Sequence, residues 1–389
     1  MALSSAVRAI IPLAGGFLAL EHFGLDHSGR AIAVSTAMVL AWLFESLHPA
    51  IVGFIGAFLF RATEAAEFEA AFGGFATALP WLLFGVLLLV TAAEHGGLSR
   101  LISNALPPAV TASPMMACLL IIATAFVLSW VIPHALARAA ILILLASAIA
   151  PAGSEWRAPI GAVAAMASAL FETHLSGSAA VLMNAGSAIA LVGAALLLCR
   201  PAGTADRTPP ASTPLDVAVV AIVVVTLLLW ASAPYHRFQP ELVGLGAGLL
   251  CAIVALGRGW KGVTADPLAM ILAGTALSIP GVLKETGAIA PLVGSVHHAA
   301  SMLALPAPLA DYWAWAGLRL FMLDPAAAAA SASPAAWTIA TSAASTTFFA
   351  IYQSPALALA MATCGSRTRH ILILGGVVFA ARSLLVLVL

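Results

Sequence analysis

Apolar residues form long runs that recur from one end of the chain to the other, and short polar, Pro or Gly segments separate them. Several runs approach or reach the length of about 20 residues that an α-helix needs to cross a bilayer. These runs cover residues 31–44, 79–93, 115–132, 178–199, 217–233, 241–256, 268–283 and 371–389. A transmembrane β-barrel would show short alternating segments instead. The pattern therefore predicts an all-α, multi-pass membrane protein, and we expect about eleven transmembrane helices.

Composition agrees with a membrane location. Of the 389 residues, 62% are hydrophobic and only 8% are charged, and the mean hydropathy of +1.07 lies outside the range of water-soluble domains. The 16 basic residues balance the 16 acidic ones, and no run of either sign occurs. This balance argues against nucleic-acid binding and leaves the lipid bilayer as the expected surroundings.

The longest polar stretch, residues 200–215, is rich in Pro and Thr and has the composition of a linker. It divides the chain nearly at its middle. We expect four parts: an N-terminal membrane segment at 1–27, a first repeat at 28–199, the linker itself, and a second repeat at 216–389.

Matching signatures on either side of the linker indicate a duplication. The segment "WLFESLHPAIVG", which starts at Trp42, matches "WASAPYHRFQPELVG", which starts at Trp230, and Gly97 matches Gly287 further along. The matched Trp, Pro and Gly residues are offset by 188 to 191 positions. Tandem halves in a membrane protein are typical of transporters, and an odd number of crossings per half would make the two repeats inverted.

Pro133 and Asp324 mark two places where a helix should break or begin inside an apolar region. Pro133 removes a helical hydrogen bond, and a new helix can start near His134 with Arg138 on the same face one turn later. Asp324 followed by Pro is a good helix start, which serves either as a cap alone or as part of a site. A helix that starts at membrane depth directs free N–H groups at a carboxylate or another oxyanion.

Two polar clusters complete the set of candidate site residues. The first spans residues 171–178 and the second spans 341–355, and both interrupt apolar sequence. Such interruptions at membrane depth normally line a cavity enclosed by protein, although Ser and Thr also bond to their own helix and allow close helix packing. The first cluster contains Glu172, Thr173, His174, Ser176, Gly177 and Ser178, and the second contains Ser342, Ser345, Thr346, Thr347, Tyr352, Gln353 and Ser354.

The order of several short signatures resembles the divalent-anion/sodium symporter family, which includes dicarboxylate, citrate and sulfate carriers of the bacterial inner membrane. The signatures are "PAIVG" at Pro49, "GGF" at Gly73, "PWLLFG" at Pro80, "AAEHGGLSRLI" at Ala92 and "LKETGA" at Leu283. The resemblance covers residues 28–365. It implies a homodimer with an elevator-type transport part, two re-entrant hairpins and a Ser-Asn-Thr motif at each hairpin tip.

This chain departs from the family pattern at the expected hairpin tips. The first tip contains Pro133, His134 and Ala135 instead of Ser-Asn-Thr. The constant offset puts the second tip at Asp324, whereas a looser spacing puts it within the residues 341–347. A carboxylate at Asp324 would repel an anionic substrate unless a cation, a proton or an Arg neutralises it. His134 titrates near neutral pH, so proton coupling is an alternative to sodium.

We therefore expect a cation-coupled carrier for a small carboxylate or another oxyanion, without a catalytic site or cofactor. The residues expected to bind substrate are Pro133, His134, Arg138, Thr173, His174, Ser176, Gly177, Ser178, Tyr352, Gln353 and Ser354. The residues expected to bind the coupling ion, a sodium ion or a proton, are Asp324, Glu172, Ser342, Ser345, Thr346 and Thr347. Two alternatives stay open: a cation/proton antiporter of the same superfamily, and an intramembrane hydrolase, for which no GxSG or HExxH signature occurs.

Overall fold

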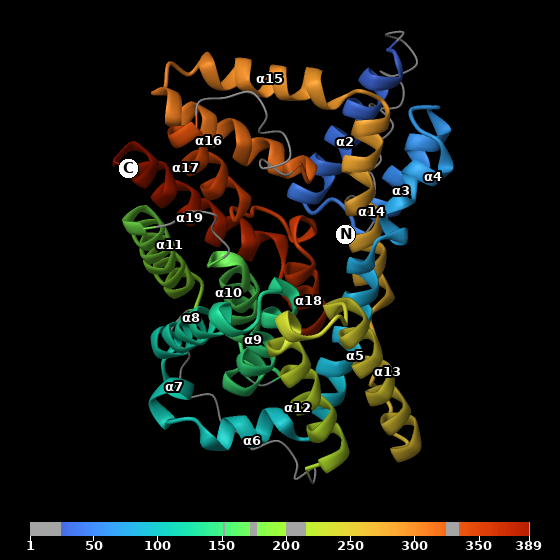
Figure 1. Ribbon diagram of the computed structural model, residues 1–389, viewed down its shortest axis with the longest axis vertical. Helices are drawn as coiled ribbons and strands as arrows, with labels where there is room; N and C mark the ends of the chain where they lie inside the picture. Colours follow the sequence, from blue (N-terminus) through green and yellow to red (C-terminus); the bar gives the residue numbers. More distant parts are fainter. Residues whose placement is uncertain (1–24, 151, 172–176, 200–214, 324–333, 389) are drawn as a thin grey trace, which may run out of the picture.

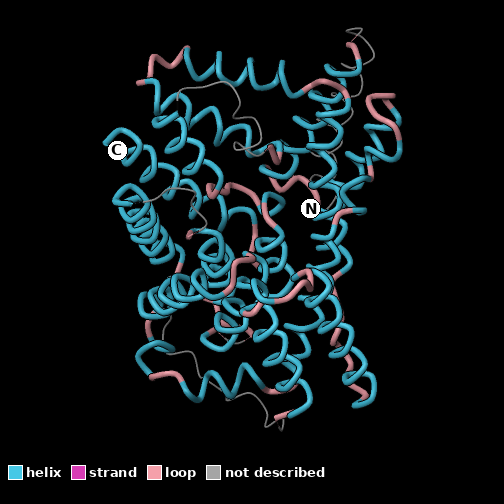
Figure 2. Tube along the Cα trace, in the orientation of Figure 1, coloured by secondary structure: helices cyan, strands magenta, loops and turns pink. Residues whose placement is uncertain are grey.

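The computed structural model describes residues 25–150, 152–171, 177–199, 215–323 and 334–388. Within these residues all regular secondary structure is helical, as the trace in Figure 2 shows. The α-helices are α2 (His27–Leu43), α3 (Pro49–Ala62), α4 (Phe68–Ala71), α5 (Ala78–His95), α6 (Leu98–Ala105), α7 (Pro108–Ala112), α8 (Pro114–Val131), α9 (Ala135–Ile149), α10 (Arg157–Leu170), α11 (Gly177–Leu198), α12 (Val217–Ala231), α13 (Pro240–Arg258), α14 (Pro267–Glu285), α15 (Ile289–Ser301), α16 (Ala307–Leu318), α17 (Pro334–Ser345), α18 (Pro355–Cys364) and α19 (Thr368–Val388).

Six of the described helices, α5, α8, α11, α13, α14 and α19, are long and apolar enough to cross a membrane. Five others, α3, α9, α10, α12 and α18, are apolar but contain only 10–17 residues. Proline and glycine divide the apolar runs of the sequence into these shorter helices. A helical membrane protein is thus supported, while the figure of about eleven crossings stays a prediction.

A buried tryptophan stabilises the connection between two consecutive helices in two places, α2–α3 and α12–α13. Trp42 Nε1 donates a hydrogen bond to the Pro49 carbonyl oxygen over 2.7 Å, and Trp230 Nε1 donates one to the Pro240 carbonyl oxygen over 3.1 Å. Both indole rings are almost fully buried, so each bond satisfies a donor that water cannot reach. The matching Trp and Pro residues of the sequence therefore make the same local contact.

Helices from before residue 200 pack directly on helices from after residue 215. α13 packs along α5, and α14 packs along α3. Gly85 and Gly248 bring the backbones of α5 and α13 together, because a β-carbon on Gly248 would overlap the Gly85 carbonyl oxygen. Gly53 of α3 meets Thr275 of α14 just as closely. Small residues at such crossings permit the close approach that is typical of membrane helices.

Two short helices lie across opposite ends of the molecule. Gly97 (φ 78°) and Gly287 (φ 68°) adopt the left-handed conformation that favours glycine, and each allows the chain to turn sharply after a long helix. α6 follows the first turn and α15 follows the second. Figure 1 shows α6 and α15 at the two ends of the long axis, with α9 and α18 between them.

Three apolar segments are interrupted at the predicted places. α8 ends at Val131 and α9 begins at Ala135, with the backbone of His134 extended between them. α10 ends at Leu170 before α11 begins at Gly177, and α17 ends at Ser345 before α18 begins at Pro355. The predicted helix start at Asp324 lies outside the described residues.

Candidate functional site

Two of the three interruptions meet at one cavity of about 250 Å³. Residues 133–136, at the start of α9, form one wall, and residues 354–356, at the start of α18, form another. Leu79 of α5 completes the lining, and α9 packs against α18. The fold therefore joins two segments that come from opposite halves of the sequence.

Both helices begin at this cavity, so backbone N–H groups without an intrahelical partner lie at its walls. Ser354 Oγ accepts a hydrogen bond from the Ala356 N–H group over 3.3 Å, whereas the side chain of His134 makes no such cap on α9. The partial positive charges of the two helix N-termini act on the same space. This arrangement favours a carboxylate or another oxyanion between the two helices.

His134 supplies the titratable group of the cavity lining. Its Nε2 atom lies 3.8 Å from Glu241 Oε1, and its buried Nδ1 atom has no hydrogen-bond partner among the described residues. The two side chains are 24% and 25% exposed. An imidazole can donate a hydrogen bond to an oxyanion or accept a proton, depending on its tautomer.

Glu241 is a candidate residue that sequence reasoning missed. It stands in the first turn of α13, directly after Pro240, where acidic residues commonly stabilise a helix start. Its position in the sequence therefore has an ordinary structural explanation. Only the packing of the helices brings it to His134.

Arg138 stabilises the interruption between α8 and α9 through hydrogen bonds. The buried guanidinium donates hydrogen bonds to the carbonyl oxygens of Ile132 (2.8 Å) and Pro133 (3.0 Å), just after α8 ends. It also donates to the Ser168 carbonyl oxygen (2.8 Å) near the end of α10. These contacts satisfy carbonyl groups that the interruption leaves without helical partners. They favour a structural role for Arg138 over the predicted contact with substrate.

Tyr352 and Gln353, also predicted to bind substrate, form contacts within the protein. The Tyr352 hydroxyl donates to the Leu320 carbonyl oxygen over 2.8 Å, and its ring stacks on Trp42 with 4.0 Å between centroids. Gln353 Oε1 accepts hydrogen bonds from the N–H groups of Phe349 and Ala350. Neither side chain lines the cavity, so Ser354 is the residue of this segment that reaches it.

The two threonines predicted to bind a coupling cation, Thr346 and Thr347, accept hydrogen bonds from an arginine. Arg382 of α19 is fully buried, and its Nη1 atom lies 2.6 Å from Thr346 Oγ1 and 3.2 Å from Thr347 Oγ1. The same nitrogen also donates to the Ala343 carbonyl oxygen, and Nε donates to Ser187 Oγ. A guanidinium this close repels a sodium ion, so a cation site at these two threonines is disfavoured. A lone Arg inside the last apolar run was the sequence signal for this cluster.

The other two hydroxyl groups of the second cluster lie in α17. Ser345 Oγ donates to the Ser342 carbonyl oxygen over 2.8 Å, within the helix. The Ser342 hydroxyl is buried, and no described residue forms a hydrogen bond with it. Neither residue lines the cavity.

Several predicted site residues are not placed. Glu172, Thr173, His174, Ser176 and Asp324 lie outside the described residues. Gly177 is the first residue of α11, and Ser178 beside it is exposed and does not line the cavity. The contribution of this first polar cluster stays a prediction.

Neither the known protein families nor the curated protein sequences give a match to this chain. Within the described residues, no group of three or more His, Cys, Asp or Glu side chains is placed to hold a metal ion. The helical membrane fold and the cavity between α9 and α18 are the features that bear on function.

Proposed function

We propose that this protein is a secondary active transporter of a small carboxylate or another oxyanion. The observation that carries the proposal is the cavity where α9 and α18 begin, with the imidazole of His134 in its lining. Two helix N-termini and an imidazole are suited to hold an anion without a metal ion. Ser354 and His134 would contact the substrate, one from each half of the chain.

Paired features of the fold support two inverted repeats, the architecture that alternating access uses. Trp42 and Trp230 make the same contact with the proline that opens the next helix. Gly97 and Gly287 make the same left-handed turn, and the helices that follow lie at opposite ends of the molecule (Figure 1). An elevator-type homodimer with about eleven crossings and two re-entrant hairpins, in a bacterial inner membrane, belongs to the same proposal.

The coupling ion in this proposal is a sodium ion or a proton. The pair formed by His134 and Glu241 favours the proton, because an imidazole in the cavity lining lies 3.8 Å from a carboxylate. The same pair supports a second candidate function, cation/proton antiport without an anionic substrate. The two candidates differ in whether an anion crosses the membrane.

Uptake into liposomes tests this proposal. Purified full-length protein would be reconstituted, and the uptake of labelled succinate, citrate and sulfate would be measured under a sodium or a proton gradient. We expect one of these anions to accumulate under one of the gradients. Cation flux with no anion uptake would favour the antiporter, and no flux of either kind would contradict both candidates.

A matched pair of histidine variants tests the site itself. We expect His134→Asn to lower the apparent anion affinity about tenfold or more, because a hydrogen bond to a charged group contributes about 1.5–3 kcal/mol. His298→Asn, on the exposed face of α15, should leave the affinity unchanged. Equal affinities in the two variants would remove His134 from the anion site.

A further inference from the structure

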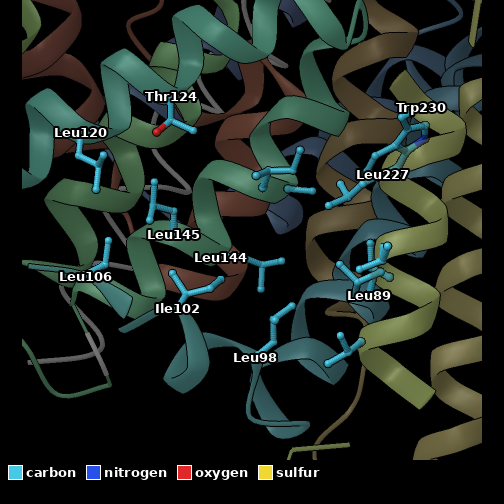
Figure 3. Close-up of a pocket in the computed structure, with 15 residues that line it drawn as sticks. Leu89, Leu98, Ile102, Leu106, Leu120, Thr124, Leu144, Leu145, Leu227 and Trp230 are labelled. Carbon is cyan, nitrogen blue, oxygen red and sulfur yellow. The ribbon is translucent and has the colours of Figure 1, made fainter. Parts of the chain in front are cut away.

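A larger cavity, of about 360 Å³, lies apart from the proposed transport site. Its walls come from α5, α6, α8, α9 and α12, and Figure 3 shows leucine side chains from these helices pointing into it. Apart from Thr124 and Trp230, all described residues of the lining are aliphatic. The Trp230 indole N–H is already bonded to the Pro240 carbonyl oxygen.

This lining decides what kind of molecule the cavity can hold. A water molecule needs two to four polar partners to stay ordered in a protein interior, and the Thr124 hydroxyl is the one polar side-chain group that remains. An empty apolar space of this size would be unfavourable, because its lining would lack packing partners. The chemistry of the walls therefore fits a flexible hydrocarbon.

The position of α6 sets the depth of the cavity in the bilayer. Leu98 and Ile102 stand one helical turn apart on α6 and line the cavity together with Leu106, which directly follows the helix, whereas Arg100 and Asn104 occupy other faces of α6. No residue of α6 is fully buried, and the helix lies across one end of the molecule (Figure 1). An amphipathic helix at the end of a membrane protein is typical of the interface between headgroups and acyl chains. The cavity thus lies just inside that interface.

The lining is continuous with the apolar outer surface. Val224 lines the cavity and is itself 47% exposed, and its neighbours Val225 and Leu228 on α12 are 54% and 63% exposed. Large apolar side chains exposed on a membrane helix face hydrocarbon. An acyl chain of the surrounding bilayer can therefore reach the cavity without crossing a polar surface.

We propose that one acyl chain of a membrane phospholipid occupies this cavity, with its headgroup at the level of α6. The chain lies between Leu89 and Leu227 on one wall, from α5 and α12, and Leu144 and Leu145 of α9 on another. Because α9 also begins at the transport cavity, the lipid contacts a helix of that site. The lipid site depends on the membrane fold and not on the identity of any transported substrate.

Photolabelling in liposomes tests the lipid site. Full-length protein would be reconstituted with phosphatidylcholine that carries a diazirine in its acyl chain, and labelled peptides would be identified by mass spectrometry after irradiation. We expect labels on inward-facing lining residues such as Ile102, Val223 and Leu144, in addition to the outer surface. Labels confined to exposed residues would overturn the proposal.

Two variants on one helix provide the matched control. Val223→Phe fills the cavity from a position that is 4% exposed, and Val225→Phe adds the same side chain on the 54% exposed side of α12. We expect labelling of Leu144 to fall several-fold in the first variant and to stay unchanged in the second. Equal labelling in both would contradict the proposal. Ala140→Leu, which adds fewer atoms to the same space, replaces Val223→Phe if that variant does not fold.

Native mass spectrometry of the purified protein distinguishes the source of the hydrocarbon. A retained mass equal to a phospholipid, lost in Val223→Phe and kept in Val225→Phe, is the expected result. A retained mass equal to detergent or to another apolar molecule, or no retained mass in any form of the protein, would overturn the assignment to phospholipid.

Discussion

The interruption between α8 and α9 is held by Arg138, which belongs to the helix that follows it, whereas the one between α17 and α18 is held in part by Arg382 of α19. Arg138 donates to three backbone carbonyl oxygens near the ends of α8 and α10. Arg382 donates to one carbonyl oxygen and to hydroxyl groups of α11 and the second interruption. The first interruption is thus stabilised by a side chain from the helix that directly follows it. The second is stabilised in part by a side chain from α19, which is distant in sequence.

At both interruptions a helix end offsets part of the cost of burying the positively charged guanidinium. The ends of α8 and α17 direct the negative end of a helix dipole at their arginine, which offsets part of the cost of burying the cation. Among the described residues, no acidic side chain forms an ion pair with Arg382. Because Arg138 donates to three carbonyl oxygens and Arg382 to one, we expect the two arginines to contribute unequally to stability.

Removal of Arg138 should have the largest effect. Arg138→Met leaves three carbonyl oxygens without this donor, and each orphaned buried acceptor costs about 1–3 kcal/mol. The free energy of unfolding should fall by about 3 kcal/mol or more, as measured by thermal denaturation in detergent. Arg258→Met is the control, because that side chain is 59% exposed and its ion pair with Asp216 should contribute less than about 1 kcal/mol. Similar losses in both variants would contradict the structural role of Arg138.

Removal of Arg382 should have a smaller effect, of about 1–2 kcal/mol. In Arg382→Met the Ala343 carbonyl oxygen keeps its hydrogen bond from Thr347 Oγ1, and a buried cation disappears. The same denaturation experiment measures the difference. Arg382→Lys keeps the charge without the planar array of donors, so it should destabilise the protein more than Met does. A decrease in the free energy of unfolding as large as that of Arg138→Met would contradict the expected difference between the two arginines.

The cap on α18 should contribute less again. Ser354→Ala removes the side chain that accepts from the Ala356 N–H group, which typically costs about 0.5–1 kcal/mol. Hydrogen exchange of the first amides of α18 would report the loss. Ser345→Ala is the control, because its hydroxyl bonds to the Ser342 carbonyl oxygen of its own helix. Faster exchange of the α18 amides in the control variant would argue against the cap.

The smallest expected effect concerns pH and distinguishes the two interruptions by charge. His134 carries a titratable imidazole, whereas none of the cavity residues 354–356 has a titratable side chain. Glu241→Gln removes a carboxylate that favours the imidazolium, so the midpoint of the pH profile of uptake should move to lower pH. A partly exposed pair is worth at most about 1 kcal/mol, which corresponds to less than about one pH unit. Glu285→Gln, on the exposed end of α14, should not shift the midpoint, and equal midpoints in both variants would exclude Glu241 from the site.

The sequence contained the local signals of this fold but not its long-range pairing. Pro133 and the polar cluster at 341–355 predicted where helices end, because backbone hydrogen bonding changes at such residues. The 190-residue spacing matched Trp42 with Trp230 correctly in local structure. The same spacing matched His134 with Asp324, which lies outside the described residues, and among the described residues the cavity joins His134 to Ser354. Spacing along a chain does not determine which helix ends meet in space.

The roles of single side chains were harder to predict for the same reason. An Arg near a helix break can bind a ligand or satisfy carbonyl groups, and only the positions of those carbonyls decide between the two roles. Arg138 was predicted to bind substrate, and the structure shows it donating hydrogen bonds to carbonyl oxygens near the ends of α8 and α10. Arg382 and Glu241 gave weak sequence signals because a lone Arg in an apolar run and an acidic residue after a helix-starting proline are both common.

The close crossing of α5 with α13 has a consequence for how the chain is made. The α2–α3 turn is completed by Trp42 and Pro49, residues that leave the ribosome almost together. Gly85, in contrast, meets its partner Gly248 only after some 160 further residues have been synthesised. During that interval α13 and α14 have not yet been synthesised, so the glycine faces of α5 and α3 lack the helices that they contact in the folded protein. Ribosome-stalled chains that end before α13 should therefore be far more sensitive to proteases than chains that include α13 and α14.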